Sequence, residues 1–297
     1  MRRSIELRLK GILPRPVAMA VRSADNYRKR LLIWRAIGRE IRGVGSSDRR
    51  ALRQSALASP FLALRNLYGW QDPVLLNDAL VEVHEVGRFR VRAHSDDLYH
   101  VLPSREPAVL AAIREHLKPG DTFIDAGANI GFFSVLAGRQ VGDQGRVLAI
   151  EMMPVTAAML RQNLSLNKIQ SATVVEKALS DQSGGTLTAH FVEGHFGMAS
   201  IVRPDGSAMQ TVEVQTTTLD EEAANVERIA LIKMDLEGAE LNAMEGAREV
   251  LARTRIILFE QLGEETRPAE FLRDFGFEVR NLEGSNFIAS KEGGGMQ

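Results

Sequence analysis

The chain has 297 residues, 44% of them hydrophobic and 25% charged, which is typical of a globular protein with one large domain and an accessory segment. It contains no cysteine, which excludes disulfides, thiolate nucleophiles and cysteine-ligated metals and fits a reducing compartment such as the cytoplasm. The net charge of −1 combines residues 1–70, at +12, with a remainder at −13, so the two parts are expected to meet partners of different charge.

The basic N-terminal part is predicted to be mainly helical over residues 4–42, with a break between Gly11 and Pro16. Apolar residues follow helical spacing along one face and arginines occupy the other; the apolar stripe is Tyr27, Leu31, Trp34, Ile37 and Ile41. No apolar run approaches the roughly 20 residues of a membrane-spanning helix. Two prolines, Pro14 and Pro16, interrupt the short candidate for a secretory signal.

Four interpretations of this basic part stay open. The first is a solvated or self-packing helical cap. The second is a helix on an anionic membrane surface, with Leu31, Trp34 and Ile37 against lipid, which would make a cytoplasmic protein peripheral to the membrane. The third is a nucleic-acid-binding segment, and the fourth is an organellar transit peptide over residues 1–60.

Helix and strand signals then follow in quick succession. Ser59-Pro60 and Asp72-Pro73 each predict the start of a helix, because proline is favoured at the first helical position. From Val81 the apolar period changes to two, which predicts a hairpin across Gly87. A helix is predicted from Pro107 to Leu117.

From Thr122 strand-like and helix-like segments alternate. The predicted strands are 122–126, 146–151, 173–179, 229–235 and 256–261, and the predicted helices are 131–140, 155–167, 239–252 and 267–275. Residues 180–220 interrupt the alternation, and a hairpin across Glu283-Gly284 ends it. The pattern predicts an α/β fold: a doubly wound, Rossmann-like sheet of seven strands with the last antiparallel and helices on both faces, preceded by the N-terminal helical segment.

The segment DAGANIG, from Asp125 to Gly131, is the most informative in the chain. It joins a predicted strand to a helix N-terminus, where a nucleotide can lie against bare backbone. Gly127 and Gly131 permit a sharp turn and close approach of a ligand. The spacing departs from the G-x-G-x-x-G of nicotinamide-binding folds, and Asp125 suits a cofactor with a cationic sulfonium. Glu151, twenty positions after Gly131, can bind ribose hydroxyls, so the segment favours S-adenosylmethionine.

Acidic residues end four of the predicted parallel strands: Asp125, Glu151, Asp235 and Glu260. Ligands bind at this edge of an open α/β sheet. Any one of these residues could simply be a turn residue. Four of them in a regular array indicate a cofactor cleft.

Several separated motifs resemble the FkbM family of S-adenosylmethionine-dependent methyltransferases. They are DAGANIGFFS, EKALSD, TLD and KMDLEGAE, and they occur in this order. The resemblance covers about residues 120–290 and does not reach the basic N-terminal part. It implies the methyltransferase form of the Rossmann-like sheet and methylation of hydroxyl oxygens in sugars, glycans or natural products.

The resemblance also assigns the cofactor-binding residues by position. Five residues would line the methionine and ribose end of the cofactor: Asp125, Gly127, Ala128, Asn129 and Gly131. Glu151 would hold the ribose hydroxyls, and Met152 would pack near the adenine. Ala178 and Leu179, with Ser180, would border the other side of the adenine, unless the two apolar residues are simply core.

The segment KMDLEGAE supplies the first candidate catalytic residue. Asp235 ends a buried strand and is placed to take or orient the acceptor's hydroxyl proton during an in-line transfer. His195, in a segment predicted to be a loop over the cleft, is the second candidate base, because histidine titrates near neutrality; its alternative is a surface loop residue. Glu237 and Glu240 have an alternative role in complementing the dipole of the next helix. Lys233 shares a face with Asp235 and is expected to pair with one of these acids.

No metal site is predicted, and most histidines receive no chemical role. Asp235 with Glu260 and Gln261 resembles in placement the oxygen cluster that holds Mg²⁺ in catechol-type methyltransferases, but nothing in the sequence supplies a third ligand. Four histidines are expected to be structural or solvated: His84, His94, His100 and His116.

The sequence therefore predicts a basic, mainly helical segment, residues 1–80, and an FkbM-like methyltransferase domain, residues 81–297, with its core at 120–290. The predicted function is S-adenosylmethionine-dependent O-methylation. The alternatives are an RNA or other nucleic-acid methyltransferase that uses the basic segment and a non-catalytic cofactor-binding module. Amino-directed nucleic-acid methyltransferases usually carry an Asn-Pro-Pro-aromatic turn where this chain has Asp235-Leu236-Glu237-Gly238. The acceptor and the oligomeric state stay open.

Overall fold

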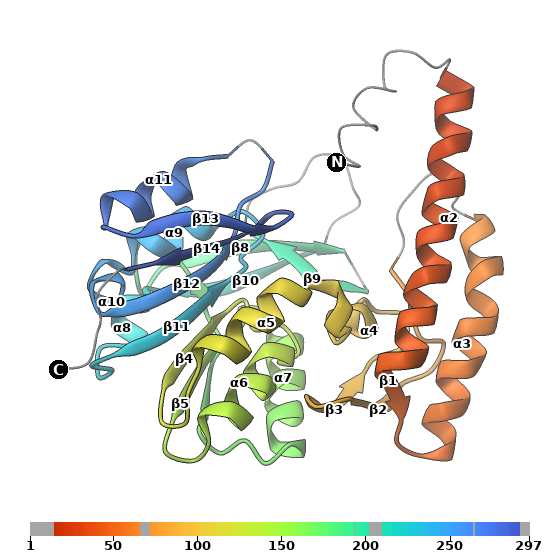
Figure 1. Cartoon of the computed structure of the whole chain (residues 1–297), viewed down its shortest axis with the longest axis horizontal. Coiled ribbons are helices and arrows are strands. Elements are labelled where there is room, and N and C mark those ends of the chain that lie inside the picture. Colours follow the sequence, from red (N-terminus) through yellow and green to blue (C-terminus); the bar gives the residue numbers. More distant parts are fainter. Residues whose placement is uncertain (1–14, 66–71, 193, 202–209, 264, 292–297) are drawn as a thin grey trace.

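The computed structural model describes residues 15–65, 72–192, 194–201, 210–263 and 265–291 (Figure 1). Its centre is a seven-stranded sheet in the order β13-β14-β12-β11-β4-β5-β6. These strands are β4 (Thr122–Ala126), β5 (Arg146–Ile150), β6 (Ala172–Val175), β11 (Ile229–Met234), β12 (Thr254–Glu260), β13 (Glu278–Glu283) and β14 (Asn286–Ser290). β14 is antiparallel to β12 and β13, and the other neighbours are parallel. The predicted sheet, with its last strand antiparallel, is confirmed.

Helices cover both faces of this sheet, as predicted. Alternate residues of each strand enter two different apolar cores, so Phe123 and Leu231 belong to one and Ile124 and Ile232 to the other. The first core is covered by α5 (Pro107–His116), α6 (Phe132–Val141) and α7 (Pro154–Leu166). The second is covered by α8 (Leu219–Glu222), α9 (Glu240–Glu245), α10 (Arg248–Ala252) and α11 (Arg267–Asp274). Burial on both faces explains the nearly continuous apolar runs of the central strands.

A smaller sheet, in the order β7-β10-β8-β9, flanks the carboxyl ends of the central strands. Its strands are β7 (Ala178–Leu179), β8 (Thr186–Val192), β9 (His195–Ser200) and β10 (Gln210–Thr217). The predicted strand 173–179 is therefore two strands in two sheets. The predicted loop around His195 is wrong, because this segment pairs antiparallel with β8 and satisfies its backbone there.

One predicted helix is divided. The helix expected over residues 239–252 is α9 and α10, with Gly246 between them. A Cβ at position 246 would collide with the carbonyl oxygen of Ser180, so the backbone at this break packs directly on the segment after β7. The helix is thus interrupted where its backbone contacts the backbone of the segment after β7.

The N-terminal part forms two helices and a strand. α2 (Arg15–Glu40) and α3 (Ser46–Arg65) lie side by side at one end of the molecule (Figure 1). Between them β1 (Ile41–Gly43) pairs with β2 (Ala79–Val83), which pairs with β3 (Gly87–Val91) in the predicted hairpin. The helix predicted over residues 4–42 is confirmed from Arg15 to Glu40, and its earlier part lies outside the described residues. Across the described residues, no helix is both long and apolar enough to cross a membrane.

Both predicted proline-led helix starts are wrong. α3 begins at Ser46, where Asp48 accepts a hydrogen bond of 2.7 Å from the Gly45 N–H, and it continues through Pro60. Residues 72–78 contain no helix, and Leu75 forms a parallel bridge with Ala93. The division at residue 80 stays a prediction.

Asn163 of α7 and Asn167, the C-cap residue of that helix, join the N-terminal sheet to the methyltransferase core. Asn163 and Asn167, one helical turn apart, accept hydrogen bonds of 2.8 Å each from the backbone N–H groups of Arg90 and Arg88 on β3. The buried Asn163 also donates to the carbonyl oxygen of Ile130, in the turn after β4, at 2.8 Å. The edge of β3 is thereby satisfied by side chains rather than by another strand.

Replacing Asn163 tests this connection. Asn163→Ala leaves the Arg90 N–H and the Ile130 carbonyl without their partner, so the free energy of unfolding should fall by about 2–4 kcal/mol. Urea denaturation measures the change. The exposed Asn242→Ala is the matched control and should change stability by less than about 0.5 kcal/mol. Equal effects of the two substitutions would show that the connection contributes no special stability.

Candidate active site

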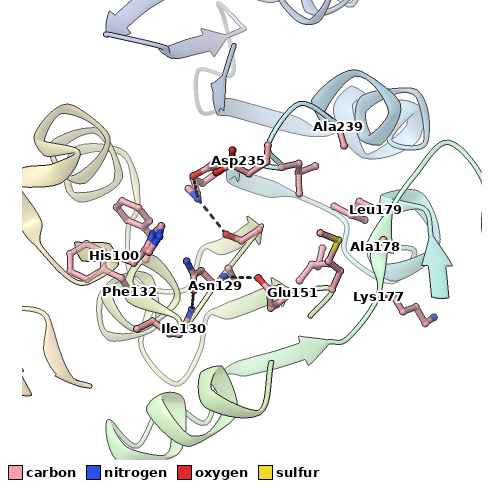
Figure 2. Close-up of a pocket in the computed structure, with 18 of the residues that line it drawn as sticks. His100, Asn129, Ile130, Phe132, Glu151, Lys177, Ala178, Leu179, Asp235 and Ala239 are labelled. Atoms are coloured by element: carbon pink, nitrogen blue, oxygen red, sulfur yellow. Dashed lines mark hydrogen bonds and ion pairs between the residues drawn. The ribbon is translucent and has the colours of Figure 1, made fainter. Parts of the chain in front are cut away.

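A cavity opens beyond the carboxyl ends of β4, β5 and β11 (Figure 2). It holds about 840 Å³ of empty space, the solvent at its mouth included, which is the size of a small-molecule site. Eight of the predicted site residues line it: Gly127, Ala128, Asn129, Glu151, Met152, Ala178, Leu179 and Asp235. Asp125 and Gly131 lie behind its wall. His195 begins β9, but its side chain lies outside the described part of the structure, so its role stays a prediction.

The turn after β4 exposes backbone to this cavity because glycine shapes it. Gly127 and Gly131 have left-handed φ angles of 82° and 94°, and Asn129 lies between them at 49°. A Cβ on Gly127 would collide with the carbonyl oxygen of Asp235, and one on Gly131 would collide with Leu160. The turn is therefore pressed between the loop after β11 and helix α7.

Glu151 fixes this turn to the end of β5. Its carboxylate accepts hydrogen bonds of 2.9 Å from the backbone N–H groups of both Asn129 and Met153. Burial raises the pKa of Glu151 to about 7, against the opposing effect of these two bonds. Each carboxylate oxygen can accept a further hydrogen bond, so Glu151 can still receive two hydroxyl donors from a ligand.

Asp125 supports the site from behind. Its side chain is fully buried, and one oxygen accepts a hydrogen bond of 2.6 Å from the hydroxyl of Ser134 on α6. The other oxygen is buried without a hydrogen-bond partner among the described residues. Burial raises the pKa of Asp125 to about 6, although the nearby Lys233 opposes the shift. In this structure Asp125 links the end of β4 to α6, and it does not line the cavity, in contrast to the prediction.

The wall opposite the turn is apolar and comes from the smaller sheet. Ala178 and Leu179 form β7, which pairs in parallel with β10, and both side chains are buried at the cavity. Met152 follows Glu151 on the neighbouring strand end. These side chains could cover the flat face of an adenine, and they also belong to apolar cores. Their positions therefore fit both interpretations of the sequence, an adenine contact and simple core packing.

Asp235 faces the turn from the end of β11 and pairs with Lys233, as predicted. The Lys233 ammonium lies 3.1 Å from an Asp235 carboxylate oxygen and 5.3 Å from the centre of the Phe133 ring. Burial lowers the pKa of Lys233, but the carboxylates of Asp235 and Asp125 outweigh this effect and hold it above its ordinary value. Burial likewise opposes ionisation of Asp235, but Lys233 and Arg105 hold its pKa below the ordinary value. Asp235 is therefore ionised at neutral pH.

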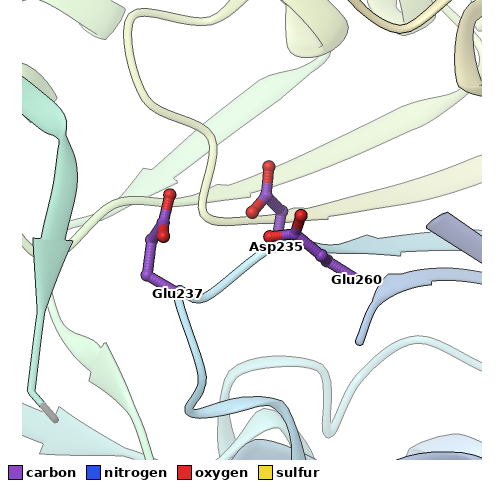
Figure 3. A group of neighbouring side chains, drawn as sticks. All are labelled: Asp235, Glu237 and Glu260. Carbon is purple, nitrogen blue, oxygen red and sulfur yellow. The ribbon is translucent and has the colours of Figure 1, made fainter. Parts of the chain in front are cut away.

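Glu237 and Glu260 stand beside Asp235 (Figure 3). The three carboxylates each offer an oxygen within 4.8 Å of the others. Burial, with the Asp235 charge, raises the pKa of Glu237 to about 8 and that of Glu260 to about 7. Carboxylate oxygens at this spacing could hold a divalent cation, and Glu237 stands where the sequence offered no third candidate ligand.

The backbone after β11 explains why Glu237 and Glu240 differ. Glu237 has a left-handed φ of 51°, and Gly238 follows at 98°, so this tight turn brings Glu237 to the cavity. The Glu240 side chain instead accepts a hydrogen bond of 2.8 Å from the Leu236 N–H and closes the same turn. Left-handed conformation at a non-glycine residue is uncommon, and in this cavity both Asn129 and Glu237 adopt it.

Two lining residues from outside the resemblance were missed. His100 ends α4 (Asp97–His100), and Arg105 ends the short helix η1 (Pro103–Arg105). Arg105 lies 2.8 Å from Nδ1 of His100, and Asp96 lies 3.3 Å from Nε2. Because arginine only donates, Nδ1 accepts and Nε2 carries the proton toward Asp96. His100 was expected to be structural or solvated. The spacing of one helical turn between Asp96 and His100 was the sequence feature that could have predicted their pairing.

The chain is similar to known methyltransferases. A model of the methyltransferase FkbM domain family matches residues 125–287. The chain is 29% identical to methyltransferase sdnD of Sordaria araneosa over 196 residues, 54% of this chain and 75% of that protein. It is 28% identical to the 2-O-methyltransferase NoeI of Sinorhizobium fredii over 167 residues, 50% of this chain and 66% of that protein. A solved S-adenosylmethionine-dependent O-methyltransferase of Thermotoga maritima has 13% identity and a TM-score of 0.43, covering 73% of this chain and 79% of its own.

The close contact at Gly127 generates a test of the cofactor site. Gly127→Ala should weaken binding of S-adenosylhomocysteine at least about tenfold, because the new Cβ must displace the loop that carries Asp235. Gly120→Ala is the matched control: its φ of 86° is close to the 82° of Gly127, but open space surrounds its Cβ position. Titration calorimetry on both variants measures the affinity. Unchanged binding by Gly127→Ala would place the cofactor away from this turn.

Proposed function

The chain belongs to the FkbM family of S-adenosylmethionine-dependent methyltransferases, and we propose that it methylates a hydroxyl oxygen of a sugar, glycan or natural product. One observation carries the proposal. The glycine turn after β4 and the carboxylates after β11 line the same cavity. The relative NoeI, which is named a 2-O-methyltransferase, supports oxygen as the acceptor atom.

The cofactor half of the cavity fits S-adenosylmethionine by its donor and acceptor groups. The carboxylate of Glu151 is available to the ribose hydroxyls, and the apolar Met152 and Leu179 suit the adenine. The bare backbone around Gly127 suits the methionine tail, because a Cβ there would fill the approach. When bound, the cofactor supplies an electrophilic methyl group on a cationic sulfur, which the surrounding carboxylates favour.

The acceptor half suits hydroxyl donors. Asp235 is an ionised hydrogen-bond acceptor, and Phe132 and Phe133 give the same cavity an apolar wall. The ionised Asp235 would repel a phosphate group close to it. This charge favours a neutral hydroxyl compound over the alternative of a nucleic acid.

Asp235 and Glu237 have different roles toward the acceptor hydroxyl. Asp235, held by Lys233, is too weak a base to take a hydroxyl proton readily, so it orients the hydroxyl. Glu237 has the higher pKa and takes the proton as the oxygen–methyl bond forms and the methyl–sulfur bond breaks. This division refines the sequence interpretation, in which Asp235 was the leading candidate base.

The pKa of Glu237 predicts the pH dependence of the reaction. Only the ionised carboxylate accepts the proton, so the rate of methyl transfer should rise with pH through about 8. Glu237→Gln should lose this rise and fall about a hundredfold in rate at high pH. The exposed Glu249→Gln is the matched control. An unaltered pH–rate profile in Glu237→Gln would exclude Glu237 as the base.

A transfer assay with labelled S-adenosylmethionine tests the proposed function. Hydroxyl-bearing glycans, lipid-linked glycans and RNA are offered with Mg²⁺ or with EDTA, and the product bond is identified by mass spectrometry. We expect an O-methyl product from a glycan. Asp235→Asn should lower kcat about a hundredfold while cofactor affinity stays within about threefold, and the exposed Asp143→Asn should behave as wild type. Transfer to RNA alone would contradict the proposal, and no transfer at all would favour a non-catalytic module.

A further inference from the structure

The N-terminal helices expose large apolar side chains beside arginines. Of the seven large apolar side chains exposed in the described part of the chain, four lie on α2 and α3. On α3, Arg50, Arg53, Leu57 and Phe61 are all exposed and follow the spacing of one helix face; we define them as the α3 stripe. Leu57 is 65% exposed and Phe61 is 70% exposed, which is unusual for side chains of this size.

Helix α2 repeats the arrangement. Its exposed face carries the α2 stripe: Arg28, Leu31, Leu32, Arg35 and Arg39. Leu31 and Leu32 are 48% and 51% exposed. The opposite face holds the buried Ile37, and α3 likewise turns the buried Ala51 and Ser55 toward the protein. Both helices therefore pack by one face and present an arginine–apolar face to solvent.

The charge of this region is strongly positive. Residues 15–65 contain twelve basic and three acidic residues. Of the three acids, Asp25 lies 2.7 Å from Lys29 and 3.9 Å from Arg28, which belongs to the α2 stripe. Glu40 and Asp48 accept hydrogen bonds from the backbone N–H groups of Ser104 and Gly45, at 3.0 Å and 2.7 Å. Three acids cannot neutralise twelve basic residues, so the region keeps a net positive charge.

We propose that the α2 and α3 stripes dock this protein on an anionic lipid surface. Arginines meet the lipid headgroups while leucine and phenylalanine enter the boundary with the acyl chains, which is the chemistry of interfacial helices. The phosphates of a nucleic acid would pair with the arginines but leave the four large apolar side chains in water. A lipid surface explains both the arginines and the apolar side chains of the two stripes. This docking does not depend on which acceptor is methylated.

A hydrogen bond joins helix α2 to the segment that lines one side of the candidate active site. Glu40, at the end of α2, holds the backbone of Ser104, and the next residue, Arg105, lines the cavity beside His100. The segment that lines the acceptor side of the cavity is thus anchored on the helices that would rest on the lipid. This arrangement suits an acceptor that is attached to the membrane.

Vesicle flotation of the full chain tests the proposal. Wild type should bind vesicles of phosphatidylcholine with about 30% phosphatidylglycerol at least about tenfold better than pure phosphatidylcholine, and high salt should release it. Arg50→Glu with Arg53→Glu should reduce binding at least about tenfold, and Leu57→Ser with Phe61→Ser several-fold. Circular dichroism and binding of S-adenosylhomocysteine should stay unchanged in both double variants, which separates docking from folding and from the candidate active site.

Two single-site controls carry the same kinds of substitution elsewhere. Arg146→Glu reverses an exposed charge, and Val155→Ser removes an apolar side chain that is 58% exposed. Both should bind vesicles as wild type does. The proposal is overturned if wild type fails to bind anionic vesicles or if the controls weaken binding as much as the stripe variants. Tight, salt-dependent RNA binding without vesicle binding would assign the stripes to nucleic acid.

Discussion

The candidate site depends on the contact between two strand ends at Gly127. The Asp235 N–H donates to the carbonyl oxygen of Ala126 at 3.0 Å, and the Asp235 carbonyl occupies the space where a Cβ of residue 127 would lie. The loops after β4 and β11 therefore cannot separate without breaking a backbone hydrogen bond, and no larger residue fits between them. This contact holds the turn after β4 and the carboxylates after β11 together in the wall of one cavity, and the proposed transfer depends on that arrangement.

Burial and neighbouring charges give the carboxylates of the cavity different pKa values. Lys233 is the buried cation that neutralises part of the acidic strand ends, and its pairing with Asp235 keeps that carboxylate ionised. At Glu151 and Glu237 the effect of burial outweighs that of the nearby cations, and it raises their pKa values to about 7 and about 8. One carboxylate is thus suited to orient a hydroxyl, one to take a proton, and one to respond to ribose hydroxyls.

The sequence predicts most of the central sheet because its signals are local. Apolar period, glycine turns and strand-end acids place β4, β5, β11 and β12 within a few residues of their observed bounds. The rest depends on tertiary pairing: α3 continues through Pro60, and the segment of His195 pairs with β8. The acceptor side was only half predicted, because His100 and Arg105 come from a segment before the family motifs, and Glu237 reaches the cavity through a left-handed turn that its sequence position does not reveal.

A crystal structure with S-adenosylhomocysteine tests the central claim most directly. The account predicts both ribose hydroxyls within hydrogen-bonding distance of the Glu151 carboxylate, the adenine between Met152 and Leu179, and the amino-acid tail along the Gly127 turn. The sulfur should then face Asp235 and Glu237 across the cavity. A ribose bound away from Glu151, or a sulfur on the far side of the turn from these carboxylates, would contradict it.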